Sequence, residues 1–111
     1  MALTRDFKVT VRERLQGDPS FREALLEEAV DCLLSSDLET GKSLLRDYIN
    51  ATIGFGELGG VTDRSPKSLM RMLSQQGNVQ ARNLFEIIGC LQHREGVHLK
   101  VQAIKVANNA A

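Results

Sequence analysis

The chain has 111 residues, with 14 Lys plus Arg against 14 Asp plus Glu, 42% hydrophobic residues and 25% charged residues. This is the size and composition of one globular domain, spanning 1–111, and its zero net charge excludes polybasic proteins that bind nucleic acid by bulk attraction. The N-terminus has no apolar signal region, and no segment approaches the roughly 18 apolar residues that a membrane span needs. We therefore expect a cytoplasmic protein that makes no contact with a membrane.

The first part of the chain, residues 1–53, is predicted to form N-terminal helices that offer a partner or dimer surface. Phe7, Val11 and Leu15 recur every four residues, which indicates an amphipathic helix that ends at Gly17.

Two further helices follow in this part of the chain. Asp18 and Pro19 are typical N-cap and first-turn residues for a second helix that ends at 35–37. The same stretch, Ser35, Ser36 and Asp37, caps a third helix that ends near Gly54 and Gly56. The residues that share its apolar face are Leu38, Gly41, Leu45, Tyr48, Ile49 and Thr52.

The second part, residues 54–92, also has helical patterning. Short helices are expected over 57–62 and 65–74, followed by a longer helix over about 79–92. Beyond Gly96 the pattern changes to a period of two, which predicts a C-terminal strand over 97–106. A single strand cannot satisfy its own hydrogen bonds, so we expect it to pair with a second copy or with the sheet edge of a partner.

Two motifs that carry chemistry in other proteins lack their required context here. Residues 54–59 match GxGxxG, but a helix rather than a strand precedes them and no acidic residue follows at the ribose-binding spacing. Cys90, His93 and His98 have no second cysteine pair to complete a zinc site. No catalytic set can be assembled by spacing, so we expect no enzyme activity, no metal and no cofactor.

The stretch 55–73 has the layout of two short helices that can present the second to a DNA major groove. Gly59 is a small residue where the helices cross, and Asp63 stands where the turn requires a positive φ. Ser65 and Pro66 start the second helix. Its predicted buried residues are Leu69, Met72 and Leu73.

This layout resembles the helix-turn-helix of the lambda-repressor-like (XRE-type) DNA-binding family over about 49–92. Leu58 and Gly59 match the family's Leu-small pair, Leu69 and Met72 match its buried positions, and Asp63 replaces its usual turn glycine. Val79 or Gln80 stands where the family often has proline. The resemblance implies an all-α, lambda-repressor-like helical bundle with extra N-terminal helices and the short C-terminal strand.

Segments 46–55, 65–73 and 81–85 also resemble a narrower group, the bacterial addiction-module antitoxins and antidote-like regulators near the host-inhibition-of-growth (Hig) type. That resemblance implies a partner toxin, typically an RNase of the RelE type, and repression of the protein's own toxin-antitoxin operon.

The charge distribution favours a local DNA surface. Residues 1–50 hold 7 basic and 10 acidic side chains, whereas 51–111 hold 7 basic and 4 acidic ones, and the stretch 64–82 has four basic residues and no acidic one. Lys67 and Arg71 are four apart and can reach base edges together. The predicted DNA-binding residues are Arg64, Ser65, Lys67, Ser68, Arg71, Gln75, Asn78 and Arg82.

The sequence thus predicts a sequence-specific transcription regulator that binds a pseudo-palindromic operator as a homodimer. The acidic N-terminal helices are an alternative partner surface, suited to a basic toxin. Two other functions remain open: a stand-alone repressor without a toxin, and a helical protein-interaction module without DNA activity.

Overall fold

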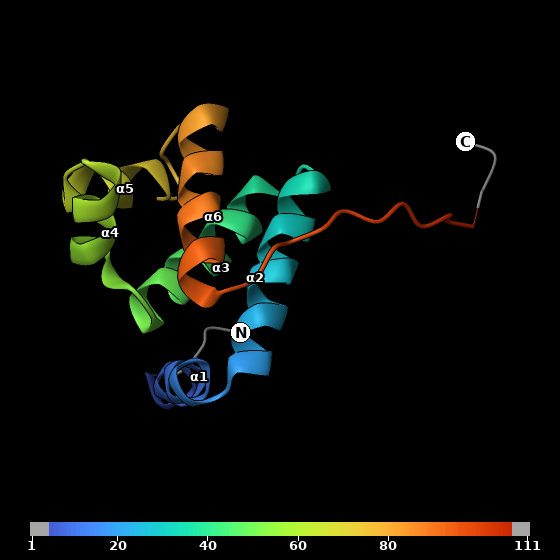
Figure 1. Cartoon of the computed structure of the whole chain (residues 1–111), viewed down its shortest axis with the longest axis horizontal. Coiled ribbons are helices and arrows are strands. Elements are labelled where there is room, and N and C mark those ends of the chain that lie inside the picture. The colour runs from blue at the N-terminus through green and yellow to red at the C-terminus, as the bar shows by residue number, and fades with distance from the viewer. Residues whose placement is uncertain (1–4, 108–111) are drawn as a thin grey trace.

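Six helices make up the part of the chain that the computed structural model describes, residues 5–107 (Figure 1). In chain order they are α1 (Arg5–Gly17), α2 (Pro19–Leu34), α3 (Leu38–Ala51), α4 (Gly54–Thr62), α5 (Pro66–Met72) and α6 (Ala81–Glu95). In the view of Figure 1, α4 and α5 lie on one side of α6, and α2 lies on the other. The prediction of an all-helical fold is confirmed.

Local capping signals set the start of three helices. Asp18, Asp37 and Ser65 precede α2, α3 and α5, and their side chains accept hydrogen bonds from the N–H three residues later at 3.2, 3.2 and 3.0 Å. Each bond satisfies one of the N–H groups that a helix start leaves without a partner. The three predicted caps are confirmed.

Two helix boundaries differ from those expected. α4 begins at Gly54, which has φ 79°, so Gly56 lies inside the helix rather than ending the one before it. α6 begins at Ala81 and continues to Glu95, and Gly96 ends it in the left-handed conformation with φ 74°. Glycine tolerates that conformation because it has no Cβ.

The predicted strand over 97–106 is wrong for the described chain. Residues 97–107 form no strand or helix and run as an extended segment beyond α6 (Figure 1). A strand needs a neighbour to accept and donate its ladder of hydrogen bonds, and the described part of this chain offers none to the segment. The alternation of apolar and polar residues is present in the sequence, but alternation alone is not sufficient to form a strand.

The hydrophobic core joins five of the helices. Its fully buried members include Leu26, Ala29, Leu45, Tyr48, Ile49, Leu58, Leu69, Leu73, Ile87 and Leu91. The apolar face predicted for the third helix is correct in its middle, where Gly41, Leu45, Tyr48 and Ile49 are buried. It is wrong at its ends: Leu38 is 53% exposed, and Thr52 is only partly buried and follows the helix as its C-cap. No helix in residues 5–107 has both the length and the apolar character needed to cross a membrane.

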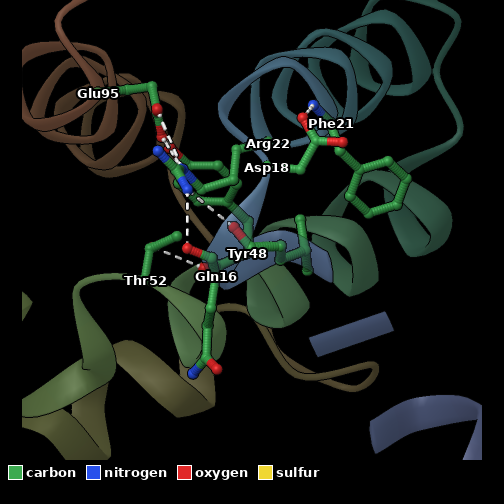
Figure 2. A network of polar contacts seen from close by, with 8 residues as sticks. Gln16, Asp18, Phe21, Arg22, Tyr48, Thr52 and Glu95 are labelled. Carbon is green, nitrogen blue, oxygen red and sulfur yellow. Dashed lines mark hydrogen bonds and ion pairs between the residues drawn. The ribbon is translucent and has the colours of Figure 1, made fainter. Parts of the chain in front are cut away.

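A polar network lies at the edge of this core and connects four helices (Figure 2). The Glu95 carboxylate of α6 accepts hydrogen bonds from Arg22 Nε of α2, at 3.0 and 3.1 Å, and from the Tyr48 hydroxyl of α3. Arg22 also donates to the carbonyl of Leu15 at 3.0 Å, which ties in the end of α1. Only 7% of the Glu95 side chain is exposed, so Arg22 and Tyr48 together compensate a largely buried charge.

This network predicts a stability change in acid. Burial by itself raises the pKa of Glu95, but hydrogen bonds from Arg22 and Tyr48 outweigh it, and the net pKa is lower than usual. A carboxyl with a depressed pKa stabilises the fold above its unfolded-state pKa of about 4.3 and loses that contribution as pH falls through the folded-state value. We expect the stability difference between the wild type and Glu95→Gln, measured by urea unfolding, to shrink from pH 6 to pH 3. A difference that is the same at both pH values contradicts the prediction.

Candidate functional site

α4 and α5 are joined by a tight turn at Asp63, and this arrangement positions the candidate site. Asp63 has φ 57° and ψ 43°, the left-handed conformation predicted for it. The N–H of Arg64 donates to the carbonyl of Gly59 at 2.9 Å and closes the turn. Ser65 then caps α5, so three residues, 63–65, separate the two helices.

The two helices approach each other closely at Gly59. A Cβ built on this buried glycine would lie 2.6 Å from the carbonyl oxygen of Arg64 and 3.3 Å from Pro66 Cδ. Because the nearer atom belongs to the backbone, a side chain cannot be accommodated without moving the turn. A small residue is therefore required where α4 meets the turn and the first residue of α5.

Adjacent glycines in α4 provide a matched pair of substitutions. We expect Gly59→Ala to destabilise the protein by about 1–3 kcal/mol, because the new methyl group overpacks the turn. Gly60→Ala should stabilise it by roughly 0.5–1 kcal/mol, since Gly60 has no atom within 4 Å of its Cβ position and alanine favours a helix. Thermal unfolding followed by circular dichroism measures both. If both variants shift Tm in the same direction, the close approach at Gly59 does not control the packing.

α5 has one buried side and one exposed side. Leu69 is fully buried and so is Leu73, which follows the helix, whereas Lys67 and Arg71 are exposed. Within the described residues, neither cation forms an ion pair. Met72, expected to be buried, is only partly so. The helix is therefore held by its leucines and presents two cations, four residues apart, to solvent.

Two basic side chains of α3 secure the segment after α5, and the sequence analysis did not identify them. Lys42 is 95% buried and its Nζ donates to the carbonyl of Gly77 at 3.0 Å. Arg46, one turn later, donates to the carbonyl of Leu73. Lys42 lies between Gly41 and Leu45 on the predicted apolar face of α3, and a lysine inside such a face is the signal that could have indicated its role.

Arg64 is engaged within the molecule rather than presented to solvent. Its guanidinium donates to Asn83 Oδ1 at 2.8 Å and forms an ion pair with Glu86 Oε1 at 3.0 Å, both on α6. This ion pair neutralises one of the four cations in the stretch 64–82. It also brings the acidic side chain of Glu86, which lies outside that stretch in the sequence, next to the basic surface. Arg64 connects the turn to α6, which fixes the orientation of α5.

The other predicted site residues lie near α5 but differ in availability. Ser65 uses its hydroxyl as the helix cap, and Ser68 is partly exposed on the first turn. Gln75 donates to Glu39 Oε1 at 3.0 Å. Asn78, in the loop after α5, and Arg82, in the first turn of α6, are exposed. Lys67, Arg71 and Arg82 are thus the exposed cations of the site without an ion pair in the described chain.

The residues weighed as metal ligands do not gather into a site. Cys90 is partly buried on α6, while His93 and His98 are exposed. Among residues 5–107, no three or more His, Cys, Asp or Glu side chains are grouped so that they could hold a metal ion. The candidate site is therefore the exposed side of α5 with its flanks.

Comparison of the chain with known proteins gave no match, whether against protein-family models, curated proteins or solved structures.

Proposed function

We propose that this protein is a sequence-specific DNA-binding transcription regulator, with α4, the turn at Asp63 and α5 acting as a helix-turn-helix. The observation that carries the proposal is the arrangement of α5: its leucines are buried, whereas Lys67 and Arg71 are exposed and without an ion pair in the described chain. The close packing at Gly59 and the left-handed turn at Asp63 also support it.

The dimensions of α5 suit the major groove. An α-helix with its side chains is about 10–12 Å in diameter, and the major groove of B-DNA is about 12 Å wide. In this docking mode the N-terminal residues of the second helix contact base edges, and here those residues include Lys67 and Ser68. Arg71 lies one turn further on the same side, where it can donate two hydrogen bonds to a guanine.

The flanking residues have a separate role in the proposal. Asn78 and Arg82 lie after α5 and can contact phosphates, which fixes register without reading sequence. Arg64, Asn83 and Glu86 position α5 through their mutual contacts. Gln75 is available to DNA only if its hydrogen bond with Glu39 opens.

Salt dependence distinguishes this proposal from a helical protein-interaction module. Each phosphate neutralised by a cation releases counterions, so affinity for duplex DNA should fall steeply with salt. With about three cations from each of two copies at the interface, we expect log Kd against log salt to have a slope of roughly 5, measured by fluorescence anisotropy. A protein that gives no anisotropy change with duplex DNA at low salt does not have the proposed function.

We further propose a two-fold dimer on a pseudo-palindromic operator, because one such unit contacts only a few base pairs. The resemblance to Hig-type antitoxins extends the proposal to repression of a toxin-antitoxin operon, with a RelE-type toxin as partner. A stand-alone repressor differs in having no such partner. Co-purification of the chain with the product of the adjacent reading frame separates the two, and a chain that purifies alone supports the stand-alone repressor.

A further inference from the structure

The extended segment after α6, residues 97–107, is here called the C-terminal arm, and it has features of a binding element. Its first residues are held to the body: the Val97 N–H donates to the Gln92 carbonyl at 3.0 Å, and the Leu99 N–H donates to Gln92 Oε1 at 2.6 Å. Leu99 also packs against the core. The arm is therefore anchored at its base.

Beyond Leu99 the arm is exposed and its backbone is unpaired. Val101, Ile104 and Val106 are 73%, 77% and 83% exposed. In the described chain, no backbone N–H or C=O from residues 100 to 107 makes a hydrogen bond. Pairing with another strand would supply hydrogen-bond partners for these backbone groups and would cover the apolar side chains.

A groove of about 700 Å³ is lined by residues of the arm and of α2. The α2 side carries four acidic residues, and the arm side carries His98 and Lys100. The apolar side chains lining the groove include those of Val30, Leu34, Val101 and Ile104. The acidic residues are Glu23, Glu27, Glu28 and Asp31. The four acidic residues outnumber the basic side chains of the arm, so the groove suits an occupant that combines basic and apolar residues in a narrow, extended form.

The arm itself has this chemistry. Residues 97–107 contain Lys100, Lys105 and His98, contain no acidic residue, and carry the exposed apolar side chains. The length also fits: eight extended residues span roughly 26 Å, and the 16 residues of α2 span roughly 24 Å.

We propose that the arm of a second copy occupies this groove, antiparallel to the resident arm, and that the exchange is reciprocal. A two-fold axis makes this contact self-complementary, since each copy supplies one arm and one acidic α2. Backbone groups of the two arms pair with each other, and Lys100 of each arm faces the acidic side chains of the other copy. The proposal does not rest on DNA binding, because the oligomeric state is measured without DNA.

Charge reversal with rescue tests this contact in the full chain. Sedimentation equilibrium of the wild type should give twice the chain mass of 12.3 kDa. Lys100→Glu with Lys105→Glu should raise the dimer Kd at least 10-fold, and so should Glu27→Lys with Asp31→Lys. The chain carrying all four substitutions restores opposite charges across the contact and should regain most of the affinity. Asp47→Lys, on the exposed side of α3, serves as the control and should leave the Kd unchanged.

Three results would overturn the proposal. The first is a wild-type chain that stays monomeric at all concentrations tested. The second is a dimer that neither pair of substitutions weakens. The third is a chain with all four substitutions whose dimer is as weak as that of either two-substitution chain, which means that the arm of one copy does not meet α2 of the other. A monomeric chain that binds a basic protein through α2 would also overturn the proposal, because the occupant of the groove would then not be a second copy.

Discussion

Replacing Lys67 and Arg71 together by alanine is expected to abolish specific DNA binding without changing the fold. Both side chains are exposed and form no ion pair within residues 5–107, so their removal leaves no buried group without a partner. Each base contact of this kind contributes roughly 1–3 kcal/mol of discrimination, so the double variant should lose at least about 30-fold in affinity for its preferred duplex. A mobility-shift titration against that duplex and a scrambled one measures the loss.

The matched control for this experiment is Arg12→Ala. Arg12 is an exposed cation on α1, outside the candidate site, so removing it changes the net charge without removing a predicted base contact. We expect its affinity to stay within a few-fold of the wild type. If Arg12→Ala weakens binding as much as the double variant, attraction is general rather than located on α5, and the site assignment is wrong. Unchanged binding by the double variant contradicts the assignment equally.

Glu95→Ala is expected to have the largest effect on stability. The substitution leaves Arg22 opposite a cavity and removes the acceptor of the Tyr48 hydroxyl, which is itself buried. Breaking a buried ion pair by removing one partner costs about 3–5 kcal/mol, and partial exposure of Arg22 places this case near about 3 kcal/mol. Urea unfolding should show this loss, and Tm should fall by roughly 10 °C or more.

An exposed ion pair between the same residue types serves as the control. Glu57 pairs with Arg94 between α4 and α6, and both side chains are about half exposed. Exposed pairs contribute about 0–1 kcal/mol, so Glu57→Ala should be close to neutral. In addition, Arg22→Met combined with Glu95→Leu should cost less than the sum of the single changes, because no unpaired charge remains. Equal losses in Glu95→Ala and Glu57→Ala would show that the network does not stabilise the fold.

Local signals made much of the fold predictable. Capping residues such as Asp18, Asp37 and Ser65 act within three residues of their own position, so their effect can be inferred from the sequence alone. The turn at Asp63 and the small residue at Gly59 were predictable for the same reason. Helical periodicity likewise identified the last helix, expected over about 79–92 and found over Ala81–Glu95.

Contacts between distant residues were not predictable in this way. Arg22 and Glu95 are 73 residues apart, Tyr48 and Glu95 are 47 apart, and Lys42 meets the Gly77 carbonyl across 35 residues. Periodicity within one helix shows which side is buried, but it does not identify the partner. Arg64 illustrates the consequence: the sequence analysis assigned it to DNA, whereas the structure pairs it with Asn83 and Glu86.

The C-terminal arm shows a different limit. Its alternation of apolar and polar residues predicted a strand, and the described chain has none there. The pattern describes how side chains would divide between two faces of a sheet, but pairing requires a second strand. If the proposed exchange of arms occurs, the alternation is satisfied only in the dimer.

The central claim, that α5 reads DNA sequence, is tested most directly by selecting from a pool of random duplexes with the full-length protein. We predict enrichment of an inverted repeat whose half-sites lie about one helical turn, roughly 10 base pairs, apart. We also predict that the chain with Lys67→Ala and Arg71→Ala enriches no sequence. A wild-type pool that stays random after repeated rounds, or a double variant that selects the same repeat, would contradict the account.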